Sequence, residues 1–149
     1  MIYVGMMSWF SDLSKLYFLE PPTEQSENTI QNQAQKETFE KEKAELLNFM
    51  EKEKPFLNPE ITLPELSKKL KLSSNQLSQI LNSGFGKNFN EFINDFRVKM
   101  VKEKMIAPEN SHLSLLGIAF ESGFNSKASF NRVFKKTTGL SPSQFMIQR

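Results

Sequence analysis

Polar and basic side chains near the end of the chain have the chemistry needed to bind a nucleic acid. Phe130, Val133 and Phe134 have the i, i+3, i+4 spacing of one buried helical face. The opposite face then carries Lys127, Ala128, Asn131, Arg132 and Lys135. Arginine and asparagine on such a face can form bidentate hydrogen bonds to guanine and adenine in the major groove of DNA. The same face could equally be the solvated basic surface of an ordinary amphipathic helix.

A repeat in the sequence favours the first interpretation. With an offset of 53 residues (130 minus 77), apolar positions and a turn glycine coincide. The pairs are Leu77 with Phe130, Ile80 with Val133, Leu81 with Phe134, Gly86 with Gly139 and Phe92 with Phe145. Upstream the offset is 52, which aligns Leu66 with Ile118. Two copies of one supersecondary unit are therefore predicted, here named the first repeat and the second repeat.

Helix-start signals predict a helix-turn-helix in each repeat. In the first, Thr62 with Glu65 and Ser73 with Gln76 have the spacing of capping boxes. In the second, Ser126 can cap the polar helix described above. Two recognition helices on one face of a duplex should enter major-groove segments about 34 Å apart.

Turn residues complete each repeat. Gly123 can adopt the left-handed backbone that ends the helix before the turn, and Phe124 should point inward.

In the first repeat the outer face of the second helix is polar and uncharged, so it can read base edges but adds little electrostatic affinity. That face consists of Ser74, Asn75, Ser78, Gln79 and Asn82.

A long helix from Asn88 to about Ile106 is predicted between the repeats, with an N-terminal cap formed by Asn88 and Glu91. Some 18 residues give a rigid spacer of about 27 Å. Strand-like alternation is absent from the sequence. We therefore predict an all-α fold, in which two tandem helix-turn-helix units are joined by a long central helix and preceded by an N-terminal helical or linker extension.

Charge is distributed unevenly along the 149 residues. Residues 1–55 contain 6 Lys and Arg against 10 Asp and Glu, whereas residues 56–149 contain 13 against 7. The net charges are thus −4 and +6. A basic C-terminal part favours a polyanionic partner through counterion release.

The N-terminal part divides by composition. Met1–Phe10 is apolar but too short to span a bilayer; it is either a terminus with little structure or the edge of a membrane or sensor segment. Residues 21–35 are polar and predict a linker, and Lys36–Lys54 predicts a helix ended by Pro55. The predicted organisation is an extension and linker over 1–35, a connector helix over 36–55 and a DNA-binding domain over 56–149.

The repeats resemble a known family. The segment Gly117–Phe145, GIAFESGFNSKASFNRVFKKTTGLSPSQF, is similar to the signature of the AraC/XylS family of bacterial transcription regulators. Gly86–Val98, GKNFNEFINDFRV, resembles the same family's inter-repeat helix. The resemblance covers roughly residues 57–149. It implies a seven-helix domain that binds double-stranded promoter DNA, in a cytoplasmic protein or the cytoplasmic part of a membrane-linked regulator.

The resemblance also implies roles for individual residues. The candidates for base reading are Lys127, Ala128, Asn131 and Arg132 in the second repeat and Asn75, Ser78 and Gln79 in the first. The candidates for phosphate contact are Ser74, Lys135, Lys136 and Ser141. The first recognition helix departs from some members because it lacks Arg or Trp on its outer face.

Other partners and functions follow less directly. The main interpretation is a sequence-specific DNA-binding transcription regulator. Residues 36–60 resemble the entry to this domain in sensor-linked members, so one alternative is an output-domain fragment of a membrane-linked sensor. The other alternative is a helical protein-interaction module that binds a partner such as RNA polymerase. No cofactor, metal or small-molecule site is expected, and the absence of Cys excludes a disulfide framework and a thiolate metal site.

An enzyme is not expected either. The single histidine, His112, precedes the second repeat and has no nucleophile or ligand partner in the sequence. Glu91 and Asp95 lie one helical turn apart, but we predict that they are solvent-facing charges on the central helix.

Overall fold

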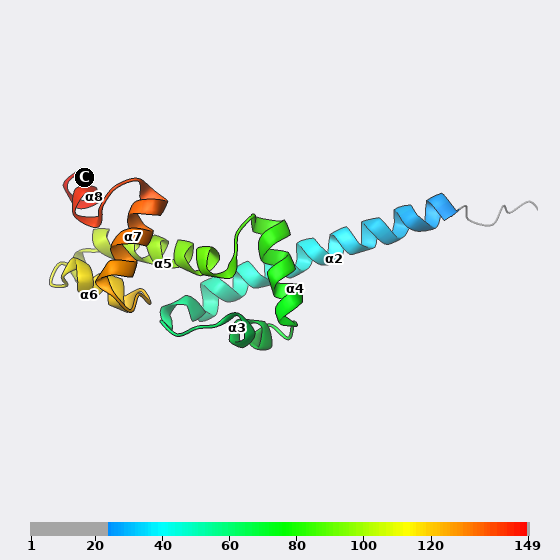
Figure 1. The fold of residues 1–149 in the computed structure, drawn as a ribbon, viewed down its shortest axis with the longest axis horizontal. Helices are drawn as coiled ribbons and strands as arrows, with labels where there is room; N and C mark the ends of the chain where they lie inside the picture. The colour runs from blue at the N-terminus through cyan, green and yellow to red at the C-terminus, as the bar shows by residue number, and fades with distance from the viewer. Residues whose placement is uncertain (1–23, 149) are drawn as a thin grey trace, which may run out of the picture. The chain divides into compact units, whose positions relative to one another are not determined.

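Every regular element that the computed structural model describes, over residues 24–148, is helical, which confirms the predicted all-α fold (Figure 1). The α-helices are α2 Glu24–Glu53, α3 Leu63–Lys69, α4 Ser74–Gln79, α5 Phe89–Ile106, α6 Leu115–Glu121, α7 Lys127–Thr138 and α8 Pro142–Ile147. Three short elements join them: the 3-10 turns η1 Pro55–Leu57 and η3 Pro108–Asn110, and the π-helical turn η2 Ile80–Gly84. The apolar Met1–Phe10 segment lies outside the described residues.

Helix α2 begins at Glu24, so residues 24–35 are helical where the sequence predicts a linker. These residues are polar, but Glu, Gln and Ala are good helix formers and Pro and Gly are absent from them. The polar composition does predict exposure to solvent, and side chains 29–38 are indeed exposed. The chain divides into two compact units between Phe39 and Glu40. In the second of these units Leu46 and Met50 of α2 are fully buried.

The helix starts in the first repeat follow the capping rules. Thr62 accepts a hydrogen bond from the backbone N–H of Glu65, whose carboxylate accepts from the Thr62 N–H. Ser73 and Gln76 form the same reciprocal pair at the start of α4. Both predicted capping boxes are therefore present. Helix α4 does not end as an α-helix but continues into the π-helical turn η2.

The central helix α5 has the predicted start and length, with 18 residues and a capping box between Asn88 and Glu91. Figure 1 shows α3 and α4 towards one end of α5 and α6, α7 and α8 around the other. Helix α5 packs against η1, α6 and α7. It therefore connects the two repeats through side-chain packing as well as through the chain.

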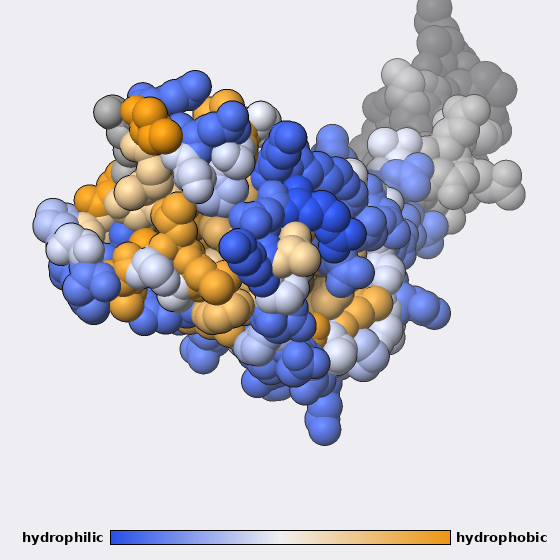
Figure 2. Space-filling view, turned by 60° about the vertical axis from the view of Figure 1, so that its left-hand side comes forward, coloured by the Kyte–Doolittle hydropathy of each residue, from blue (hydrophilic) through white to orange (hydrophobic). Residues whose placement is uncertain are grey.

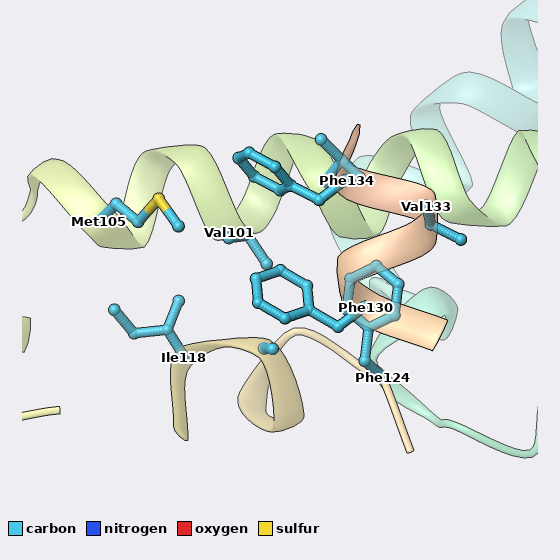
Figure 3. Close-up of a cluster of buried hydrophobic side chains, with 9 residues drawn as sticks. Val101, Met105, Ile118, Phe124, Phe130, Val133 and Phe134 are labelled. Carbon is cyan, nitrogen blue, oxygen red and sulfur yellow. The ribbon is translucent and has the colours of Figure 1, made fainter. Parts of the chain in front are cut away.

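Aromatic rings fill much of the interior, and eight of the 14 phenylalanines in the sequence belong to two chains of ring contacts. The second repeat has a chain of ring contacts, with centroid separations of 5.3 Å for Phe124–Phe130, 5.6 Å for Phe130–Phe134 and 5.5 Å for Phe134–Phe145. Aliphatic side chains of α5 and α6 complete this cluster (Figure 3). A second chain of rings, 5.0–5.5 Å apart, lies at the first repeat and consists of Phe85, Phe92, Phe96 and Phe56.

Candidate nucleic-acid interface

The two repeats share their backbone capping pattern. Each has three helix N-caps, and the caps pair at the two offsets found in the sequence: Thr62 with Ser114, Ser73 with Ser126 and Asn88 with Ser141. Positive φ angles coincide as well, at Lys71 (57°) with Gly123 (96°) and at Gly86 (64°) with Gly139 (79°). The sequence repeat is thus a repeat of backbone conformation.

The buried face is repeated too. All six aligned apolar positions of α4–η2 and α7 are at most 9% exposed: Leu77 and Phe130, Ile80 and Val133, Leu81 and Phe134. Leu66 in α3 and Ile118 in α6 are buried as well. The second helix of each repeat is therefore fixed by the same three positions, and its opposite face points outward.

Helix α7 brings the predicted base-reading residues of the second repeat together on one outer face. Lys127, Ala128, Asn131 and Arg132 are all exposed, and so is Lys135. Among residues 29–148 these polar side chains have no hydrogen-bond or ion-pair partner, so they are available to a ligand. On the face seen in Figure 2, strongly hydrophilic side chains gather beside a band of apolar ones.

The equivalent face of α4 is polar but less open. Asn75 and Gln79 are exposed, whereas Ser78 is partly buried. The Ser74 hydroxyl lies 3.3 Å from that of buried Ser67, so it is already within a hydrogen bond inside the repeat. The face carries no charge, as the sequence indicates.

Two of the other three predicted phosphate contacts, Ser141 and Lys136, also have partners in the protein. Ser141 caps α8 by accepting a hydrogen bond from the Gln144 N–H at 3.2 Å. Lys136 donates to the Glu91 carboxylate, with 3.1 Å between Nζ and Oε1. Of the four candidates, Lys135 is the one whose side chain has no partner among the described residues.

An open cleft of about 530 Å³ lies where α7 faces the N-terminal half of α5. Its lining includes three cationic residues, Lys87, Arg132 and Lys136, together with Glu91 and Asp95. Lys136 pairs with Glu91 and Lys87 pairs with Asp95. Both acids are partly buried and paired, whereas the sequence predicts solvent-facing charges. The sequence does not predict these pairs, because Lys136 lies 45 residues after Glu91 and Lys87 lies in the turn before α5.

Glu91 has two partners at once. Its carboxylate accepts from Lys136 and from the Asn88 backbone N–H. The hydrogen bond from Lys136 lowers the pKa of Glu91 below its usual value, and the Asn88 N–H adds to this effect. The ion pair with Lys136 therefore favours the ionised form of the Glu91 carboxylate.

Arg97 of α5 joins residues 56–58 to the turn of the second repeat, and sequence reasoning did not identify it. Its Nε donates to the Phe56 carbonyl at 2.9 Å and its Nη2 to the Asn58 carbonyl at 3.0 Å. Its guanidinium also lies 5.9 Å from the centre of the Phe124 ring, in the turn of the second repeat. Burial lowers the pKa of Arg97, and the charge of Glu60 opposes this. Arg97 thus fixes α5 relative to residues 56–58 and the second turn.

No helix among the described residues combines the length and the apolarity needed to cross a bilayer. His112 is exposed in the turn before α6. Among the described residues there is also no group of three or more His, Cys, Asp or Glu side chains placed to hold a metal ion.

Comparison with known proteins places this interface in a family. The profile of the family described as "Helix-turn-helix domain" matches residues 66–148, more than half of the chain. An uncharacterized HTH-type transcriptional regulator of Staphylococcus aureus (strain COL) is 31% identical over 90 residues, 60% of this chain. The uncharacterized HTH-type regulator YtdP of Bacillus subtilis is 28% identical over 90 residues. The matches span only 12% and 11% of those two regulators.

Solved structures have the same arrangement. The C-terminal domain of the two-component response regulator yesN from Fusobacterium nucleatum is 30% identical, with a TM-score of 0.58, and the match covers 70% of this chain and 96% of that one. A Listeria innocua protein of unknown function has a TM-score of 0.60 at 25% identity, with 71% and 95% covered. The C-terminal domain of AraT from Geobacillus stearothermophilus shares the fold at 22% identity, with a TM-score of 0.58 and coverage of 74% and 84%. The chain carries the DNA-binding domain of an HTH-type transcription regulator and belongs to the AraC/XylS family.

Proposed function

We propose that this protein regulates transcription by placing α4 and α7 in successive major-groove segments of promoter DNA. The observation that carries the proposal is the repeated backbone. The same caps, the same positive φ positions and the same buried triplet present one outward-facing helix in each repeat. Two such helices on one protein suit two groove segments about one helical turn apart.

Helix α7 is the stronger reader in this proposal. Arg132 can form a bidentate contact to guanine and Asn131 one to adenine. Lys127 can donate to base acceptors, and the methyl group of Ala128 can contact a thymine methyl. Lys135 and Lys136, in the last turn, are proposed to contact phosphates, together with Ser141 at the start of α8.

Helix α4 adds contacts that depend on hydrogen bonds alone. Asn75 and Gln79 can each pair with adenine, and Ser78 can donate or accept at a base edge. Ser74 is proposed to contact a phosphate once its bond to Ser67 is exchanged. Without a charged side chain this helix gains little from counterion release, so α7 should supply most of the affinity.

The family context supports a role as the output part of a larger signalling arrangement. The related domain from Fusobacterium nucleatum is the C-terminal domain of a two-component response regulator. We propose that α2 connects the DNA-binding domain to an upstream sensor or membrane segment, and that RNA polymerase is a further partner. Activation and repression are both compatible with this proposal.

The experiment that tests the function is selection of bound duplexes from a random DNA pool, with the full chain at moderate salt. We expect a bipartite motif whose half-sites are about one helical turn apart. A single half-site would mean that only α7 reads bases. Salt-sensitive binding without any motif would contradict sequence-specific recognition and favour the protein-interaction module.

Two substitutions on α7 separate base reading from phosphate contact. Arg132→Ala should lose discrimination at one base pair by about 1–3 kcal/mol, because a bidentate pair is lost. Lys135→Ala should weaken binding to all duplexes similarly and reduce the salt slope by about one. The measurement is Kd for the selected site and its single-base variants at several salt concentrations. Equal, sequence-independent losses for both variants would exclude Arg132 as a base reader.

A further inference from the structure

Acidic side chains of α5 form ion pairs with two of the three cationic side chains that line the cleft beside α7. Lys136 pairs with Glu91, and Lys87 pairs with Asp95. Arg132 lines the same cleft and has no acidic partner among the described residues. The pairing is thus selective: the acids hold both lysines, which bind phosphate as point charges, and leave the arginine, which can read a base.

We infer that Glu91 acts as an internal substitute for a DNA phosphate on Lys136 and thereby limits the sequence-independent affinity of this domain for DNA. The inference rests on the proposed function, in which Lys136 contacts a phosphate. Glu91 lies on α5 and Lys136 on α7, 45 residues apart in sequence, so the pair exists only in the folded domain.

The exposure of the pair allows such an exchange. The side chain of Lys136 is 74% exposed and that of Glu91 is 43% exposed. An exposed ion pair of this kind is weak, so a DNA phosphate can replace the carboxylate. The exchange nevertheless has a consequence, since a lysine that already has an anion gains less from the phosphate. Fewer counterions are then released when DNA binds.

The position of Glu91 in a capping box provides a clean test. Glutamine at this helix position can still accept from the N-cap N–H, so Glu91→Gln removes the charge and keeps the cap of α5. Glu65→Gln is the matched control. Glu65 occupies the same place in the capping box of α3, where it accepts from Thr62 at 3.0 Å, and it forms no ion pair among the described residues.

The measurement is Kd of the full chain for the selected duplex and for a random duplex across a salt series. Glu91→Gln should tighten binding to both duplexes by about two- to five-fold at low salt, the range expected from an exposed pair. The salt slope should steepen by about one, because Lys136 now acts as a full cation. The ratio of the two affinities should not change, since a phosphate contact carries no sequence information. Glu65→Gln should leave both the affinity and the slope close to wild type.

A double-mutant cycle tests whether the effect passes through Lys136. In a Lys136→Gln background, Glu91→Gln should have no further effect on affinity or slope. An undiminished gain in that background would overturn the inference, because Glu91 would then act by its own repulsion of DNA. An unchanged or weaker affinity of the single Glu91→Gln variant would also overturn it.

Binding to inorganic polyphosphate separates this inference from the proposed function. If the wild-type chain bound no DNA, the proposed function would fail, but Lys136 would still be available to a phosphate polymer. Glu91→Gln should then bind polyphosphate more tightly than both wild type and Glu65→Gln. Equal polyphosphate affinities for all three would show that Glu91 does not restrain Lys136.

Discussion

Phe134→Ala should lower the free energy of unfolding by about 3–5 kcal/mol, the range for removing a fully buried aromatic ring. Phe134 is 0% exposed. Its ring lies 5.6 Å from that of Phe130 and 5.5 Å from that of Phe145, so it joins α7 to α8. Figure 3 shows its side chain directed from α7 towards α5. Alanine would leave a cavity where these elements meet.

Urea denaturation of the full chain measures this loss, and Phe120→Ala is the matched control. Phe120 lies on α6 of the same repeat but is 48% exposed, so its replacement should change stability by less than about 1 kcal/mol. Equal losses for the two variants would contradict the assignment of Phe134 to the core. Phe134→Ala should also bind DNA less tightly under conditions where part of the protein is unfolded, because the position of α7 depends on the Phe134 ring.

Local rules account for the elements that the sequence predicts well. Capping boxes such as those of Thr62 and Asn88 depend on side chains three residues apart, and the apolar triplet of α7 depends on one helical period. Each of these signals is complete within a short window. The outer faces follow, because a helix with one buried face exposes the other. The exposure of the outer face of α7 was therefore predictable from the sequence, whereas a role in DNA binding stays a prediction.

Contacts between distant residues account for what the sequence does not predict. Arg97 bonds to a carbonyl 41 residues away, and Glu91 pairs with a lysine 45 residues away. Neither partner can be found from local spacing, since many lysines and many carbonyls are equally suitable in sequence. The start of α2 was missed for another reason. A polar composition predicts exposure, but an exposed segment can still be helical.

The two repeats differ at the end of the second helix. Helix α4 ends in the π-helical turn η2, whereas the equivalent part of α7 is a regular helix. Lys43 of α2 lies over this turn: its Nζ is 5.6 Å from the centre of the Phe85 ring, and a Cβ on Gly84 would be 2.9 Å from its Cδ. The position equivalent to Gly84 in the second repeat is Thr137.

Gly123→Ala is expected to be the most damaging single-methyl change in the second repeat. Gly123 has a φ of 96°, a conformation that costs an L-residue about 1–2 kcal/mol. A Cβ there would lie 2.1 Å from the Phe56 carbonyl oxygen and 3.1 Å from the Leu57 Cα, both of them backbone atoms. Displacing these atoms adds a packing cost of about 1–3 kcal/mol. The free energy of unfolding should therefore fall by about 2–5 kcal/mol.

Gly139→Ala separates the two costs. Gly139 has a φ of 79°, but a Cβ at this position would meet no other part of the protein within 4 Å. This variant should therefore lose only the conformational contribution of about 1–2 kcal/mol, the cost of a left-handed L-residue. Urea denaturation of both variants gives the comparison. Equal losses would show that the contact with Phe56 yields easily and that backbone conformation alone requires the glycine.

The first repeat already indicates which cost dominates. Its equivalent position is Lys71, which adopts a φ of 57° with a full side chain, so a left-handed backbone does not by itself demand glycine in this fold. What distinguishes Gly123 is the approach of residues 56 and 57, the same segment whose Phe56 carbonyl accepts from Arg97 at 2.9 Å. Alanine at position 123 should therefore displace that carbonyl and weaken the bond to Arg97. Gly123→Ala should then reduce DNA affinity even under conditions where the variant is folded. Wild-type affinity in the folded variant would show that the contact between residues 56–57 and Gly123 does not position α7.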